Sequence, residues 1–144
     1  MSGTYTEQQE LRQLVVNLGA AVAAGTNETW MLLTIPTGVP AVHIMSATLQ
    51  NGASVTANAT DYNTFVVTKG ASTAVATLNV GATNLTADTA VAFTRTATVA
   101  DQKLTAGDTL SLVKTAVLNG TAGATSIQAL LTIWYRYGYD TNAT

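Results

Sequence analysis

Turn-forming residues recur at short intervals along this chain, and the segments between them have the composition of β-strands. Glycine tolerates the positive φ that tight turns require, and Asn and Asp side chains bond their own backbone in turns. These turn signals lie at Gly25, 37–40, 51–52, 69–70, Gly81, 106–108 and 119–120. Between them we expect strands over 30–35, 42–49, 64–68, 74–80, 91–99, 109–118 and 127–137. About eight short strands separated in this way predict an all-β fold, an antiparallel sandwich or barrel.

Two of these segments alternate clearly enough to assign their faces. Successive side chains of a strand point to opposite sides of the sheet, so every second residue shares a face. In 91–99 one face is expected to hold Val91, Phe93, Arg95, Ala97 and Val99. In 127–137 one face is expected to hold Ile127, Ala129, Leu131, Ile133, Tyr135 and Tyr137, and the other Gln128, Leu130, Thr132, Trp134 and Arg136.

The chain length favours one domain with an extension at its beginning. With 144 residues the chain can bury one core but not two comfortable ones. No charge run, proline-rich linker or internal repeat marks a domain boundary. We therefore expect residues 1–20 to form an N-terminal arm and residues 21–144 to form a single β-sandwich domain.

The arm has two alternative structures. Thr6 and Gln9 match a helix capping box, and Leu11, Leu14 and Val15 follow at helical spacing. The same residues could instead lead into a first strand over 14–18. We favour a polar arm that runs into that strand.

Charged residues are scarce, and their scarcity excludes several classes of function. They make up 10% of the chain, against about 25% in an ordinary globular domain. Threonine, alanine, asparagine and serine take their place, including at outward-facing strand positions such as Thr64 and Thr68. The net charge is −2, and the six basic residues are scattered, so nucleic-acid binding is not expected.

The sequence shows no sign of export or membrane insertion. The first ten residues have neither the basic nor the apolar region of a secretory signal. The most apolar stretch, 30–35, is too short to cross a bilayer. The chain contains no cysteine, which excludes disulfides and thiolate metal sites. We expect a protein that is made in the cytoplasm and makes no membrane contact.

Residues with catalytic potential are present, but their pattern does not predict an enzyme. His43 is the single histidine, and no carboxylate lies near it in sequence, so a metal site is not expected. A Ser-His-Asp set with Ser46 and Asp61 is formally available, but no nucleophile-elbow pattern supports it. The eight acidic residues are dispersed and mostly lie beside turns; Asp108 is expected to bond its own backbone. We therefore expect no catalytic residue, no metal and no cofactor.

The last predicted strand ends in a cluster of aromatic residues. Trp134, Tyr135, Tyr137 and Tyr139 lie within six residues of each other, beside Arg136. Both faces of the strand carry large rings, so a core on one side cannot use all of them. A cluster at the end of the barrel is one interpretation. A contact with another protein is the second, because Trp, Tyr and Arg are common at interface hot spots, and sugar stacking is the third.

Several segments, taken in order, resemble the small auxiliary capsid proteins of tailed bacteriophages, known as decoration, cement or head-fibre proteins. These segments are VAAGTNETWMLLTIPTG at 22–38, ATDYNTFVVTKG at 59–70, AGDTLSLVKTAVLNGTA at 106–122 and IQALLTIWYRYG at 127–138. The similarity lies in their order: Ala-Gly-Thr before a strand ending in Ile-Pro, a strand ending in Lys-Gly, a Gly-Asp turn before Leu-x-Leu, and an aromatic last strand. It covers about residues 20 to 138.

The resemblance implies a jelly-roll β-sandwich that assembles as a trimer on the capsid surface and stabilises the lattice of the major capsid protein. It implies no catalysis and no cofactor. The interface residues expected on this basis are Leu11, Leu14, Trp30, Trp134, Tyr135, Arg136, Tyr137 and Tyr139. The alternative is a jelly-roll adhesin or carbohydrate-binding module on a phage head or tail, with tyrosines as the sugar platform.

Overall fold

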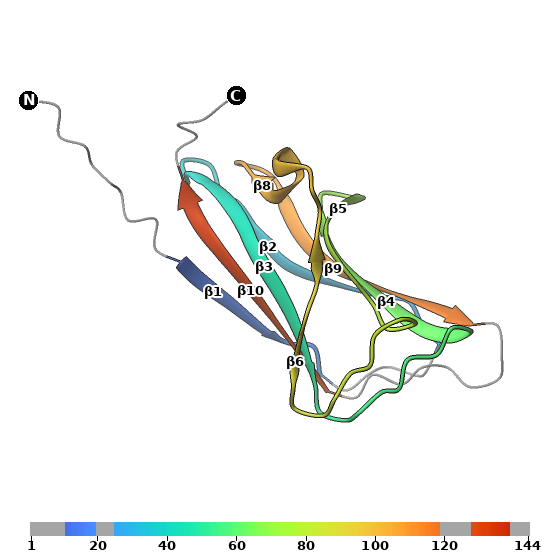
Figure 1. Ribbon diagram of the computed structural model, residues 1–144. Helices are drawn as coiled ribbons and strands as arrows, with labels where there is room; N and C mark the ends of the chain where they lie inside the picture. The colour runs from blue at the N-terminus through green and yellow to red at the C-terminus, as the bar shows by residue number, and fades with distance from the viewer. Residues whose placement is uncertain (1–10, 20–24, 119–127, 139–144) are drawn as a thin grey trace, which may run out of the picture.

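Two antiparallel sheets packed face to face make up the protein (Figure 1). The computed structural model describes residues 11–19, 25–118 and 128–138. Its elements are β1 (Leu11–Asn17), β2 (Glu28–Thr34), β3 (Ala41–Asn51), β4 (Asp61–Lys69), β5 (Thr73–Asn79), β6 (Ala90–Ala92), β7 (Thr94–Arg95), the 3₁₀ helix η1 (Val99–Gln102), β8 (Lys103–Leu104), β9 (Thr109–Leu118) and β10 (Ala129–Gly138). Sheet A has the order β1-β10-β3-β6, and β8 also pairs with β3. Sheet B has the order β2-β9-β4-β5-β7.

Strands from opposite ends of the chain are neighbours in both sheets. In sheet A, β10 lies between β1 and β3, and in sheet B, β9 lies between β2 and β4. This interleaving of early and late strands across two sheets is the jelly-roll form of the β-sandwich. The predicted all-β, jelly-roll-like fold is confirmed.

The N-terminal segment, which was compatible with a helix or a strand, contains a strand in its described part. β1 pairs in antiparallel fashion with β10, from Leu11 opposite Arg136 to Asn17 opposite Leu130. The helical alternative is therefore wrong for residues 11–17. Since β1 is a strand of sheet A, the sandwich includes residues 11–17. Residues 1–10, including Thr6 and Gln9 of the expected capping box, lie outside the described residues.

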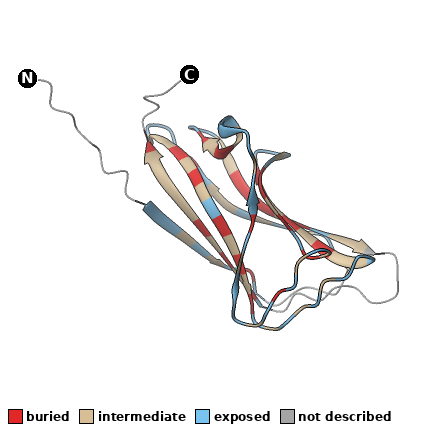
Figure 2. Cartoon of the chain, viewed as in Figure 1, coloured by how far each residue is buried: buried red, intermediate tan, exposed pale blue. Residues whose placement is uncertain are grey.

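The hydrophobic core fills the space between the sheets. Alternate residues of each long strand are buried, which gives the banded pattern on β3 in Figure 2. Leu49, Leu131 and Ile133 contribute from sheet A, and Phe65 and Leu112 from sheet B; each is at most 1% exposed. Because the strand period is two, the same alternation places threonine and other polar residues on the outer faces.

The prediction of one strand over 91–99 is wrong. The observed strands in this segment are shorter, and the residues expected on one face do not share a face. Its first part, Ala90–Ala92, pairs with β3 in sheet A, whereas Thr94–Arg95 pairs with β5 in sheet B. The chain crosses between the sheets at the buried Phe93, whose backbone N–H bonds the Ala47 carbonyl. Alternation defines a common face only while a strand stays in one sheet. Val99, expected on the same face as Phe93, is 69% exposed.

The predicted faces of the last strand are confirmed for the members that lie in β10, which begins at Ala129 and so leaves Gln128 outside the strand. Ala129, Leu131 and Ile133 point into the core, and Trp134 and Arg136 lie on the opposite face. The pairing with β3 shifts by one residue between Trp134 and Tyr135, where β3 carries a bulge. Ile127 lies outside the described residues.

Arg95, Lys69 and Lys114 bind groups of the protein itself. The Arg95 guanidinium donates to the carbonyls of Ile44 and Met45 at the β3 bulge, with N–O distances of 3.2 and 3.0 Å. The Lys69 ammonium donates to the carbonyls of Ala100 and Lys103 at 3.1 and 3.0 Å. Both side chains therefore tie one sheet to chain segments beyond its own strands. The third, Lys114, forms an ion pair with Glu28 inside the sandwich.

The turn before β9 is held by an aspartate, as expected. The Asp108 carboxylate accepts a hydrogen bond from the Thr105 backbone N–H at 2.7 Å and another from its hydroxyl at 3.1 Å. The turn is also bonded to Ile35, the residue that follows β2: the Ile35 N–H bonds the Asp108 carbonyl, and the Gly107 N–H bonds the Ile35 carbonyl. Gly107 has φ +89°, which a side-chain-bearing residue rarely adopts.

These hydrogen bonds predict a pH-dependent contribution of Asp108 to stability. The backbone bond from Thr105 is the main cause that lowers the pKa of Asp108 from its ordinary 3.8. A lowered folded-state pKa stabilises the fold above the ordinary pKa, and this stabilisation is lost as the pH falls through the lower folded value. Asp108→Asn should therefore destabilise the protein at pH 7 and have progressively less effect below pH 3.8.

Urea denaturation of both proteins across this range, with an NMR titration of the Asp108 carboxyl, measures the effect. Thr105→Val is the control, since it keeps the backbone donor and should retain most of the lowered pKa. A carboxyl that titrates at or above 3.8 would contradict the prediction.

Candidate interaction surfaces

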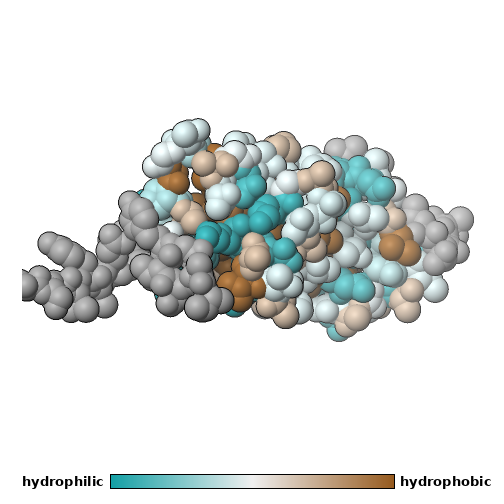
Figure 3. Space-filling model, turned by 90° about the horizontal axis from the view of Figure 1, so that it is seen from above, coloured by the Kyte–Doolittle hydropathy of each residue, from teal (hydrophilic) through white to brown (hydrophobic). Residues whose placement is uncertain are grey.

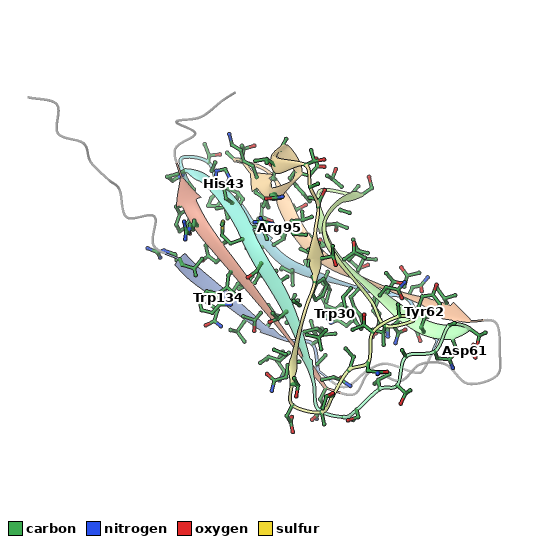
Figure 4. All side chains as sticks on the ribbon, viewed as in Figure 1. Trp30, His43, Asp61, Tyr62, Arg95 and Trp134 are labelled. Carbon is green, nitrogen blue, oxygen red and sulfur yellow. The ribbon has the colours of Figure 1, made fainter. Side chains whose placement is uncertain are left out.

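The described residues contain no assembled catalytic or metal site. No group of three or more His, Asp, Glu or Cys side chains in this part of the chain could hold a metal ion. His43 lies on the outer face of sheet A, opposite Arg136, whereas Asp61 begins β4 at the other end of the sandwich (Figure 4). The formal Ser-His-Asp set therefore does not come together. None of the described helices is long and apolar enough to span a membrane.

Four of the predicted interface residues pack into the protein's own interior. Leu14, Trp30, Tyr135 and Tyr137 are half-buried and contact the hydrophobic core. Figure 4 shows Trp30 between the two sheets. Strand parity explains their burial. Tyr135 and Tyr137 share a face with the buried Ile133 of β10. Leu14 and Trp30 lie opposite the buried Ile133 and Leu112 of the neighbouring strands. These four side chains contribute mainly to the packing of the core, and little of their surface remains for contact with a partner.

The two tyrosines form a compact group at one end of the sandwich. The rings of Tyr135 and Tyr137 meet edge to face, with centroids 5.7 Å apart, and the Arg12 guanidinium lies 5.1 Å from the Tyr137 ring centroid. Burial raises the pKa of Tyr135, and the neighbouring Tyr137 raises it further. Rings packed in this way do not offer a flat sugar platform. Tyr139 lies outside the described residues, and the carbohydrate-binding alternative stays a prediction.

The other three predicted interface residues come together on the outer face of sheet A. Leu11 is paired with Arg136 across β1 and β10, and Trp134 precedes Arg136 by two residues on the same face. Trp134 does not belong to the core, and Figure 4 shows it on the side of β10 away from sheet B. Leu11 is 48% exposed, as is Val15, which the sequence analysis did not single out as an interface residue.

A second surface, on the outer face of sheet B, was not predicted as a unit. Its residues lie on the side of the five strands that faces away from sheet A, and we call it the threonine face. Its members are Thr29, Met31, Thr34, Tyr62, Thr64, Val66, Thr68, Ala74, Thr77, Asn79, Thr94, Thr109, Ser111, Val113, Thr115 and Val117. None of them is charged. The sequence indicated this face only through the outward-facing threonines in 64–68. The order of the strands shows that five such rows are adjacent.

The threonine face is hollowed near one end. An open depression of about 500 Å³ is lined by residues of β2, β4 and β9 and by the β4–β5 turn. Its floor holds the buried hydroxyls of Thr68 and Ser111. Met31, 67% exposed, lies beside it, and its sulfur accepts a hydrogen bond from the Ser111 hydroxyl at 3.2 Å. The lining is neutral throughout, so the depression is suited to an uncharged group rather than to an ion.

The face of the molecule seen from above has few strongly hydrophilic or hydrophobic areas among its described residues. In the view from above, most described residues are pale, with small teal and brown groups among them (Figure 3). Threonine and serine have intermediate hydropathy, which accounts for this appearance. The fold thus defines the class of protein as a jelly-roll β-sandwich. One of its outer faces is neutral, and the other carries Arg136, His43 and Trp134. No protein-family model, curated protein or solved structure matches this chain.

Proposed function

We propose that this protein is a structural subunit of a virion. In this role it binds the capsid surface as a decoration or cement protein, assembles as a homotrimer and stabilises the lattice of the major capsid protein. It performs no catalysis and requires no cofactor. The order of its sequence segments, which resembles that of auxiliary capsid proteins, supports the proposal, as does the jelly-roll fold.

The observation that carries the proposal is the threonine face. A charged side chain that is covered by a neighbouring subunit loses its hydration, and this cost can exceed what an ion pair returns. Threonine and valine avoid that cost, and their β-branched side chains lose little rotamer freedom on burial. An ordinary protein surface is rich in Lys and Glu, which are depleted at interfaces. A five-stranded face without charge is therefore suited to lasting contact with another subunit.

A lysine at the centre of this face should break the assembly. We expect the wild-type protein to sediment at micromolar concentration with about three times the monomer mass of 14.8 kDa. Val66→Lys, on the central strand β4, places a charge that would lose its hydration in the interface, so this variant should sediment as a folded monomer. Thr56→Lys is the matched control, since Thr56 is exposed and lies in the connection between β3 and β4. A wild-type monomer, or a Val66→Lys trimer, would contradict the proposal.

The capsid role is tested separately by co-sedimentation. Shells assembled from the major capsid protein of the same virion should carry the wild-type protein into the pellet, and they should resist heating better when it is bound. Shells that leave the protein in the supernatant would refute the capsid role, even if the trimer is found.

A further inference from the structure

A row of basic side chains crosses the outer face of sheet A. Arg136 on β10 lies opposite His43 on β3, and His43 lies opposite Lys103 on β8. Side chains opposite each other on adjacent antiparallel strands have Cβ atoms about 5 Å apart, so the three form one continuous row. Leu11 on β1 extends the row on the other side of Arg136. No described strand residue of this face is acidic.

The hydrogen bonding of the Arg136 side chain is incomplete. Its side chain is half-buried, and its Nε atom is buried without a hydrogen-bond partner. A buried donor without an acceptor is costly, more so when it belongs to a charged group, and such groups are rare in folded proteins. Within the described part of the chain, Arg136 also has no ion-pair partner. This contrasts with Arg95 and Lys69, whose charged groups donate to backbone carbonyls.

Apolar side chains flank the row. Trp134 is the neighbour of Arg136 on the same face of β10, and the 48% exposed Leu11 and Val15 lie beside them on β1. Tryptophan and arginine are the residues most often found at binding hot spots. β1 is also an edge strand, with no described strand on its outer side. Unpaired backbone groups at a sheet edge can accept an additional strand.

We propose that this face binds an extended acidic segment of a partner protein. A carboxylate of the segment binds the Arg136 guanidinium, and its apolar side chains pack on Trp134, Leu11 and Val15. Guanidinium and carboxylate match in geometry and charge, which favours an acidic partner. Two cationic side chains and a histidine beside a tryptophan, on a chain of net charge −2, favour a protein segment over nucleic acid. The surface lies on the opposite sheet from the threonine face, so this inference does not depend on the trimer.

A synthetic peptide of alternating glutamate and valine is the probe. With the full-length Trp30→Phe protein, Trp134 is the remaining tryptophan, and its fluorescence should change as the peptide binds. Arg136→Ala should weaken binding about tenfold or more, because a charge-assisted hydrogen bond is lost, and Arg136→Lys should weaken it less. Arg12→Gln is the control: it removes the same charge from the inner side of β1 and should leave binding unchanged. Urea denaturation of each variant shows whether it is folded.

Three results would overturn the inference. The first is equal binding of a lysine–valine peptide or tighter binding of a thymidine decanucleotide. The second is absent binding of the glutamate–valine peptide, or binding that Arg136→Ala leaves unchanged. The third is a change in sedimenting mass on Arg136→Ala, which would assign the face to self-association. Binding that persists in the monomeric Val66→Lys variant would separate this surface from the threonine face.

Discussion

Replacing Lys114 with alanine is expected to destabilise the folded protein by about 3–5 kcal/mol. Lys114 points into the sandwich from β9 and is 2% exposed, and its ammonium group is paired with the Glu28 carboxylate, whose side chain is 14% exposed. The substitution leaves that carboxylate in the interior without its partner. It also removes the aliphatic stem that packs beside Phe65 on the neighbouring strand. Both effects act in the same direction.

A double-mutant cycle separates the pair from the packing. Glu28→Leu and Lys114→Met should each be destabilising on the same scale, since each leaves a buried charge without its partner. Lys114→Met combined with Glu28→Leu should cost much less than the sum of the single changes, because no unpaired charge remains. Urea denaturation at pH 7 and one protein concentration gives the free energies. Thr56→Ala, at an exposed residue of the connection between β3 and β4, is the control. If Lys114→Ala costs under about 1 kcal/mol, as at a surface ion pair, the buried pair does not exist in solution.

Phe65→Ala is expected to destabilise the protein by a similar amount, about 3–5 kcal/mol. Phe65 is 1% exposed and is the largest of the fully buried side chains. It lies on the central strand β4, between Lys114 on β9 and Leu78 on β5. Removal of the ring loses its transfer free energy and leaves a cavity that two hydrogen-bonded neighbouring strands cannot close.

Graded substitutions test the cavity explanation. Phe65→Leu should cost less than Phe65→Ala, since the smaller cavity loses fewer contacts. Val99→Ala is the matched control, because it also truncates an apolar side chain but one that is 69% exposed; it should change the free energy of unfolding by less than about 0.5 kcal/mol. Equal effects of Phe65→Ala and Val99→Ala, measured by urea denaturation, would show that Phe65 is not in a packed core.

Local patterns were sufficient to predict most of the strands. The segments 42–49, 64–68 and 109–118 each lie within an observed strand, because turn residues bound them and β-branched residues fill them. The segment 91–99 was the failure. Its alternation continues through Phe93, but the chain changes sheets there, and a change of sheet leaves no mark on the order of polar and apolar residues.

The candidate surfaces were predicted less completely than the strands. The sequence singled out both Trp30 and Trp134 as interface residues, although one contacts the core and the other does not. Parity along a single strand separates the two faces but does not say which face meets another sheet. The row formed by Arg136, His43 and Lys103 joins residues from three segments of the chain, and only the pairing of β10, β3 and β8 brings them together.

The amino-acid order alone determined that this chain forms an all-β fold with a largely uncharged surface, since both properties depend on residue type and on a period of two. The tertiary structure decided on which face of the molecule the uncharged residues lie together. Adjacent strands come from distant parts of the chain, so a continuous face exists only after the sheets form. The threonine face and the Arg136 row are therefore products of strand order, which local sequence does not encode.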